Sequence, residues 1–346
     1  MITSVSAEAT RDRHLGHARA GRSRGPAAIP PRSLAVVVAA LAASATLLAA
    51  ATAAARPSCF GHRATIVGNH LGNHIKGTPH ADVIAALGGR DRVIGNGGRD
   101  IICGGGGRDH LLGGNHPNRL HRDKPTKLIG GPGNDDIHGG FASDFIVGDN
   151  ASLTGDATGP VGHDHLDGDY GNDYVVGDNY SRFDAIGGKH DVLLGQKGND
   201  TMIGDSAVTG AGTARGGGND HFESMSDKDF EVGDSYSPAG TAAGGGKDEI
   251  NAGPQRDFVV GDSYTKTGIA IGSGRDQIHL RPGPDTAYGD NHAASPQGKV
   301  RGGKHDFIGG AGGIDHLFGG PARDTCNGGR GHRDSARGCE FVLEVP

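Results

Sequence analysis

The apolar residues from Gly77 onward recur every nine positions, and each follows an aspartate by two residues. The aspartates are Asp82, Asp91, Asp100 and Asp109, and glycines cluster before each of them. Glycine accepts positive φ without a Cβ clash, so the first six residues of each unit are predicted to make a tight turn. The last three residues should form a short strand whose middle side chain points inward, because side chains alternate along a strand.

The inward positions predict a thin apolar spine, too small to stabilise the chain alone. Two nine-residue units would make one coil with a turn on each side. Glu231 occupies an inward position and should disturb the spine near Asp229. The other inward positions are Ile84, Val93, Ile102, Leu111, Ile137, Ile146, Leu166, Val175, Leu193, Met202, Ile250, Val259, Ile278, Ile308 and Leu317.

A longer period overlies the nine-residue period in the middle of the chain. The tripeptide Gly-Asp-Asn or Gly-Asp-Ser occurs six times, and its successive separations are 29, 27, 29, 28 and 28 positions. Each super-repeat holds two aspartate-bearing units and one polar loop, such as 150–162 or 263–273. The aspartates of this motif are Asp149, Asp178, Asp205, Asp234, Asp262 and Asp290.

The N-terminal segment 1–55 has the pattern of a secretory signal. Its first part, 1–33, carries six arginines and two acids, and the uncharged stretch 34–55 ends in three alanines. A basic region, an apolar region and small residues before a cleavage site are typical of signal peptides, so we expect cleavage after Ala55 and secretion. An uncleaved anchor is the alternative, because an apolar stretch as long as 34–55 can span a bilayer.

We expect five segments along the chain: a signal peptide (1–55), an N-terminal cap (56–76), repeats with one insertion at 115–127 (77–147), loop-decorated 28-residue super-repeats (148–300), and terminal repeats with a disulfide cap (301–346).

Composition argues against a conventional globular core. Glycine supplies 65 of 346 residues, tryptophan is absent and aromatic residues make up 5%. Such a chain is either disordered or held by something besides apolar packing, and the periodicity argues against disorder. Without the segment 1–55, 38 acidic and 28 basic residues remain, and 33 of the acids are aspartates. A net charge near −10 argues against nucleic acid as a partner.

The four cysteines lie near the two ends of the repeat region. An even number in an exported chain favours disulfides over a metal site, since no two are spaced as C-x-x-C. Three pairings are possible. We favour Cys59 with Cys103 and Cys326 with Cys339, because each bond would then staple one end.

The nine-residue unit matches a known consensus, G-G-x-G-x-D-x-U-x, so the chain resembles the RTX-type, or haemolysin-type, calcium-binding repeat proteins. The resemblance spans about 64–334 and is strongest at 77–114. The flanks also look like those of small exported members. The resemblance implies an all-β parallel β-roll solenoid with loop decorations, in which Ca²⁺ lies between turns stacked on the same side. A three-sided β-helix with 28-residue coils is the alternative.

The resemblance also implies the calcium ligands. They are the aspartates at the sixth position: Asp82, Asp91, Asp100, Asp109, Asp135, Asp144, Asp164, Asp173, Asp191, Asp200, Asp220, Asp229, Asp248, Asp257, Asp276, Asp285, Asp306, Asp315 and Asp324. Partners should be about two units apart: Asp82 with Asp100, Asp91 with Asp109, Asp144 with Asp164, Asp173 with Asp191, and Asp200 with Asp220. Aspartate is replaced at Asn73, Asn118 and Thr126, so calcium binding at those turns should be weak.

We therefore expect a secreted, non-catalytic protein that folds on calcium and has a structural or adhesive role, with calcium ions as partners and no membrane contact after cleavage. An extracellular polysaccharide or a cell surface is the candidate larger partner. Loops carrying Tyr180, Tyr236 and Tyr264 could form a binding face. The sequence lacks H-E-x-x-H, G-x-S-x-G and P-loop motifs. The alternative is a secreted enzyme acting on polysaccharide, with its site on the solenoid face. The histidines are interpreted as polar surface residues.

Overall fold

The computed structural model describes residues 56–114, 124–330 and 333–345. The predicted signal peptide, 1–55, lies outside these ranges, as does Asn118. Every regular element of the described residues is a β-strand. In that part of the chain no helix is long and apolar enough to cross a membrane.

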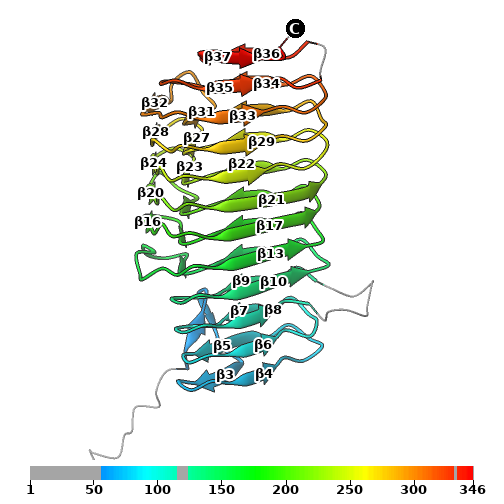
Figure 1. Cartoon of the computed structure of the whole chain (residues 1–346). Helices are drawn as coiled ribbons and strands as arrows, with labels where there is room; N and C mark the ends of the chain where they lie inside the picture. Colours follow the sequence, from blue (N-terminus) through cyan, green and yellow to red (C-terminus); the bar gives the residue numbers. More distant parts are fainter. Residues whose placement is uncertain (1–55, 115–123, 331–332, 346) are drawn as a thin grey trace, which may run out of the picture. The chain divides into compact units, whose positions relative to one another are not determined.

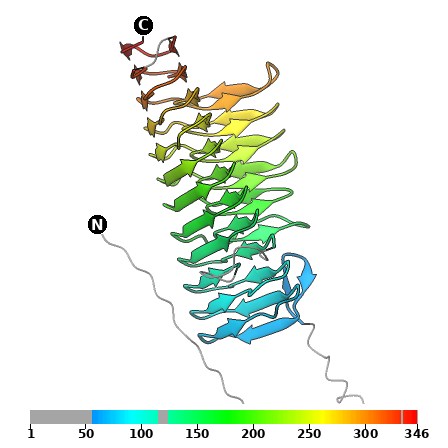
Figure 2. The same ribbon diagram turned by 90° about the vertical axis from the view of Figure 1, so that its right-hand side faces the viewer.

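Two long parallel sheets face each other across the stack, and each coil contributes one strand to each (Figure 1, Figure 2). Sheet 1 contains 12 strands of the described chain: β4 (His74–Lys76), β6 (Arg92–Ile94), β8 (His110–Leu112), β10 (Asp136–Gly140), β13 (His165–Asp169), β17 (Val192–Lys197), β21 (His221–Ser226), β25 (Glu249–Asn251), β29 (Gln277–His279), β33 (Phe307–Gly309), β35 (Thr325–Asn327) and β37 (Phe341–Leu343).

Sheet 2 also has 12 strands within the described ranges: β3 (Ile66–Asn69), β5 (Val83–Leu87), β7 (Ile101–Cys103), β9 (Lys127–Ile129), β11 (Phe145–Val147), β14 (Tyr174–Val176), β18 (Thr201–Ile203), β22 (Phe230–Val232), β26 (Phe258–Val260), β30 (Thr286–Tyr288), β34 (His316–Phe318) and β36 (Ser335–Arg337). The two parallel sheets confirm the predicted β-roll.

The insertion expected at 115–127 ends earlier than predicted, because Lys127 begins β9.

In the middle coils, the chain leaves sheet 2 and runs through an outer loop before it returns to sheet 1. Each such loop, for example 148–163 between β11 and β13, is here called an excursion. The excursions pair with one another, so the 28-residue coil of the alternative fold is also present, as an enlargement of the roll. Figure 1 shows the outer strands as a column beside the main sheets. Sheet 3 contains β12 (Ala151–Ser152), β15 (Tyr180–Ser181), β19 (Ala207–Val208), β23 (Tyr236–Ser237), β27 (Tyr264–Thr265) and β31 (His292–Ala293). Sheet 4 contains β16 (Ala185–Ile186), β20 (Thr213–Arg215), β24 (Thr241–Ala243), β28 (Ile269–Ile271) and β32 (Lys299–Arg301).

The apolar spine lies between sheets 1 and 2. All fifteen predicted apolar inward residues are 0% exposed, and Phe222 and Leu128 extend the same cluster. Most strands of sheets 1 and 2 bury one side chain here, and equivalent positions stack coil upon coil, so the core is about one side chain wide. A spine this thin leaves much of the stability to the turns.

A second apolar layer covers the outer face of sheet 2. Val147 follows the inward Ile146 by one residue and so points to the opposite face, where it is buried. Tyr264 from sheet 3 packs in the same layer, with its ring 5.1 Å from that of Phe230 between centroids. The excursions are therefore packed against the roll rather than loosely attached to it.

The close stacking of coils requires glycine at particular turn positions. Gly198 has a φ of +138°, and a Cβ added there would lie 1.2 Å from the carbonyl oxygen of Gly171 in the preceding coil. Any larger residue would push the two turns apart. This contact explains why glycine recurs in step with the coils.

Both ends carry a disulfide, and the pairing is the favoured one. Cys59 bonds Cys103, and Cys326 bonds Cys339. Cys59 belongs to a small antiparallel pair, β1 (Ser58–Cys59) and β2 (His62–Arg63). The first bond therefore ties this N-terminal pair to β7 of the roll.

Glu231 occupies the spine position predicted for it and is 0% exposed. Its register neighbours on sheet 2 are Met202 and Val259. The Ser224 hydroxyl donates a hydrogen bond of 2.5 Å to Glu231 Oε1, whereas the buried Oε2 accepts none. Burial raises the pKa of this carboxyl well above its usual range.

Replacing this polar pair with apolar residues should stabilise the calcium-saturated protein. We expect the double variant Ser224→Ala/Glu231→Met to gain about 1 to 3 kcal/mol in the free energy of unfolding, because an unsatisfied buried oxygen is removed. Met202→Ala is the matched control and should lose about 2 to 5 kcal/mol by opening a cavity. Denaturant unfolding measures both. A double variant less stable than the native chain would contradict this interpretation of Glu231.

Candidate metal centre

The turns that lead from sheet 1 into sheet 2 form one edge of the stack, here called edge A. The sixth residue of each turn ends up at the same height in its coil, so these residues form a row. Row A contains Asp82, Asp100, Asp144, Asp173, Asp200, Asp229, Asp257, Asp285, Asp315 and Asp334. All of them are buried.

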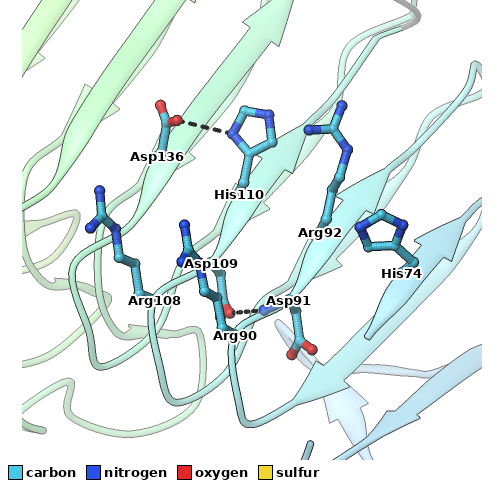
Figure 3. A pocket seen from close by; sticks show the side chains of 8 residues that line it. All are labelled: His74, Arg90, Asp91, Arg92, Arg108, Asp109, His110 and Asp136. Atoms are coloured by element: carbon cyan, nitrogen blue, oxygen red, sulfur yellow. Dashed lines mark hydrogen bonds and ion pairs between the residues drawn. The ribbon is translucent and has the colours of Figure 1, made fainter. Parts of the chain in front are cut away.

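The turns that lead back into sheet 1 form the opposite edge, edge B. Its row B contains Asp91, Asp109, Asp135, Asp164, Asp191, Asp220, Asp248, Asp276, Asp306 and Asp324. In Figure 3 the Asp109 carboxylate reaches the backbone of Asp91, one coil earlier. The 19 predicted aspartates thus divide between the two edges, and Asp334 extends row A by one residue that the sequence interpretation missed.

Each residue of row A or row B is here called a rung. The same kind of hydrogen bond links most successive rungs in both rows. The backbone N–H of one aspartate donates to Oδ1 of the aspartate in the next coil, at 2.8 Å for both Asp82 to Asp100 and Asp91 to Asp109. These two predicted partnerships are therefore observed. The contact fixes one oxygen of each carboxylate and sets the spacing between coils.

The partners predicted for the middle coils are wrong. Asp144 does not face Asp164, Asp173 does not face Asp191, and Asp200 does not face Asp220. The observed partners of Asp144, Asp173 and Asp200 are Asp173, Asp200 and Asp229, at sequence separations of 29, 27 and 29. The excursion adds residues on edge B. Counting about two nine-residue units from a row A aspartate therefore reaches an aspartate of row B, as it does from Asp144 to Asp164.

Asn73 and Thr126 stand in the rows where aspartate is replaced, as the sequence indicates, and both keep the backbone contact, whereas Asn118 lies outside the described residues. The N–H of Asn73 donates to Asp91 Oδ1, and that of Thr126 donates to Asp144 Oδ1, both at 2.6 Å. Thr126 therefore continues row A after Asp100. At the far end, Glu340 Oε2 accepts from the N–H of Asp324 at 2.9 Å and closes row B.

The second oxygen of the rung carboxylates is buried and mostly has no hydrogen-bond donor. Oδ2 has none at Asp109, Asp135, Asp191 and Asp220, among many others. Asp82 differs, because Thr78 donates to its Oδ2 from both N–H and hydroxyl. An ionised oxygen without a donor or a cation is costly in the interior.

Most of these Oδ2 atoms point back at the glycine that begins their own turn. A Cβ built on Gly130 would lie 2.3 Å from Asp135 Oδ2 and 2.1 Å from the carbonyl oxygen of Gly148 in the next coil. The glycine leaves space where a carboxylate oxygen and a carbonyl oxygen converge. The aspartate side chains and the carbonyls at these turns offer oxygen atoms, a donor set that suits calcium, which takes 6–8 oxygen ligands in flexible geometry.

A third row of aspartates comes from the Gly-Asp-Asn and Gly-Asp-Ser motifs, which the sequence interpretation did not assign to metal. Row C contains Asp149, Asp178, Asp205, Asp234, Asp262 and Asp290. These residues are 0 to 3% exposed. Backbone N–H groups from the far ends of the excursions donate to these carboxylates, at 2.9 Å from Gly162 to Asp149 and 3.1 Å from Gly246 to Asp234. The near-constant spacing of the motif was the signal that could have identified this row.

Rows B and C converge inside edge B. A Cβ built on Gly274 would lie 2.6 Å from carboxylate oxygens of both Asp262 and Asp276. One oxygen of Asp149 and one of Asp234 have no donor. Burial, reinforced by neighbouring carboxylates, raises the pKa of Asp149 and of Asp262 to about 10 each. In the absence of a cation, the interior of edge B therefore opposes ionisation.

Comparison with known proteins agrees with this geometry. A family model described as RTX calcium-binding nonapeptide repeat (4 copies) matches residues 76–111, 127–151, 161–179, 187–207 and 302–333. A comparison with curated proteins found no match. The matched ranges include both edges of the roll, and the nonapeptide repeats of this family bind Ca²⁺. The chain therefore contains RTX calcium-binding nonapeptide repeats.

Proposed function

We propose that the chain folds on calcium, that the aspartates of rows A and B are its ligands, and that it serves a structural or adhesive role outside the cell. The observation that carries the proposal is the repeated buried Oδ2 without a donor, held beside a turn glycine. A divalent cation between successive turns would satisfy these oxygens and cancel their repulsion.

The electrostatics of the rungs support coupling between folding and calcium. Burial raises the pKa of Asp135 to about 9 and of Asp164 to about 8, with further contributions from adjacent carboxylates. At neutral pH the metal-free fold must therefore keep such groups protonated or leave them charged and buried. Both states cost free energy relative to an unfolded chain, whereas bound calcium favours the ionised, folded state.

Row C extends the proposed ligand set in the middle coils. Its free oxygens lie on the inner side of edge B, close to those of row B, as the Gly274 position indicates. The middle coils thus bring two carboxylates per coil to this edge, where an ordinary turn brings one. We infer that row C carboxylates contribute to calcium binding as well as anchoring the excursions.

Secretion and an extracellular binding role fit the family and the surface. RTX repeat proteins are typically extracellular. Of the tyrosines expected to form a binding face, Tyr180 and Tyr236 line a hollow of about 490 Å³ together with Phe145, Tyr174, Thr209, Pro238 and Lys266. Tyr264 instead is only 7% exposed. Aromatic faces beside a lysine suit an acidic polysaccharide, whose sugar rings stack on aromatics.

Calcium removal should unfold or loosen the chain between its disulfide-stapled ends. We expect a β-rich circular dichroism spectrum in excess Ca²⁺ that is largely lost in chelator and returns when calcium is restored. Asp191→Asn should raise the calcium concentration at the midpoint, because one rung loses its charge. Glu249→Gln, which changes an exposed acid outside the rows, should not. A spectrum insensitive to chelator would refute the proposal.

Loss of one row C charge should weaken calcium binding without releasing the excursion. Asp234→Asn keeps the oxygen that accepts the Gly246 N–H and removes the charge. We expect fewer bound calcium ions per chain, or weaker binding, by equilibrium dialysis. Asp184→Asn, whose carboxylate lies outside the three rows and accepts the Thr213 N–H, is the control and should behave as native. Unchanged binding in Asp234→Asn would leave row C with an anchoring role alone.

The aromatic hollow should account for any polysaccharide binding. We expect the calcium-loaded protein to retain acidic polysaccharides in affinity electrophoresis, and the double variant Tyr180→Ala/Tyr236→Ala to lose most of this retention. Phe183→Ala, which removes an exposed aromatic ring outside the hollow, is the control. Equal retention by the two variants would exclude the hollow, and release of new reducing ends would instead favour the enzyme alternative.

A further inference from the structure

Three neighbouring strands of sheet 1 bring a carboxylate and three imidazoles to one place on its outer face. Asp136 on β10 pairs in register with His110 on β8 and with His165 on β13. His138 lies two residues after Asp136 on the same strand and so shares its face. The intervening residue, Ile137, is in the buried spine, so the four polar side chains point outward.

The imidazoles approach Asp136 from different sides. His110 Nδ1 lies 3.0 Å from Asp136 Oδ2, and His138 Nε2 lies 3.2 Å from Asp136 Oδ1. His165 Nδ1 is 3.5 Å from the same Oδ1, is shielded from solvent and makes no hydrogen bond. Figure 3 shows His110 turned toward Asp136. Ligand atoms of His110, Asp136 and His138 all lie within 4.8 Å of one another, close enough to share an ion.

We propose that His110, Asp136 and His138 bind one divalent transition-metal ion, of which Zn²⁺ is the most suitable, with His165 beside the site. Two imidazole nitrogens and a carboxylate are a donor set that favours zinc and its neighbours, whereas calcium takes oxygen ligands. The site is thus distinct in chemistry from the aspartate rows. It is also distinct in position, because it lies on a sheet face and the rows lie at the edges.

A second layer of acids supports this assignment. The Nδ1 of His138, on the far side of the ring from the proposed ion, faces Asp167 Oδ2 at 3.8 Å and Asp169 Oδ2 at 3.9 Å. A carboxylate behind the ring of a metal-binding histidine orients the imidazole and makes it a stronger ligand. At these distances the two carboxylates favour a proton on His138 Nδ1 and leave Nε2 to face the proposed ion.

The open side of the site adjoins a hollow of about 490 Å³, which His110 and Asp136 line together with Arg90, Arg92 and Arg108 (Figure 3). Arg92 is the register neighbour of His110. Its charge opposes a bare cation, whereas Asp136, Asp167 and Asp169 favour one. Three protein ligands leave a coordination position for water or for an anion, and the arginines favour the anion.

Zinc titration of the full chain in saturating calcium tests the proposal. We expect calorimetry to show one Zn²⁺ bound per chain in a large excess of Ca²⁺. His138→Ala should abolish this binding, and Asp167→Asn should weaken it by about tenfold. His279→Ala, on the outer face of the same sheet but outside the cluster, should bind as native. Circular dichroism in calcium checks that each variant is folded.

Co²⁺ offers an independent readout of the ligands. The native chain in calcium should give the visible absorption of a four- or five-coordinate cobalt site, and His138→Ala should lose it. Absence of zinc binding by the native chain, or equal binding by His138→Ala, would overturn the proposal. Neither result bears on the calcium rows, because calcium is saturating throughout.

Discussion

The structure depends on one contact repeated along both edges, in which the backbone N–H of nearly every row A or row B aspartate donates to Oδ1 of the aspartate one coil further on. This bond fixes the carboxylate, spaces the turns and leaves Oδ2 facing the turn glycine. It also gathers negative charge into a row that water does not reach. The hydrogen bond that aligns the coils also buries the carboxylates close together, where a cation would stabilise them. Folding and calcium binding therefore depend on the same contact.

The thin spine makes this dependence strong. Most strands of the two main sheets contribute one fully buried side chain to the spine, and at one coil that side chain is the polar Glu231. Apolar packing alone holds each coil weakly, and most contacts between coils of the described chain join neighbours, as in other repeat proteins. The remaining stability must then come from the contacts of the aspartates at each turn.

The nine-residue period was sufficient to predict the spine, the turns and all aspartates of rows A and B except Asp334, because each is a local consequence of glycine and aspartate at fixed offsets. It could not predict the partners in the middle coils. The partner of Asp144 depends on where the chain goes at 150–162, and the register of β11 with β14 settles that. The histidine cluster was likewise hidden, since His110 and Asp136 are far apart in the sequence and meet only through strand register.

The excursions have a consequence for the length of the molecule. Sheet 3 and sheet 4 join each excursion to its neighbours in the same register as the main sheets. A whole super-repeat could therefore be added or removed without disturbing the others. Each unit would change the height of the stack by only about 4.8 Å, the spacing between strands. With the ligands proposed above, the number of bound calcium ions would grow in proportion to the height of the stack.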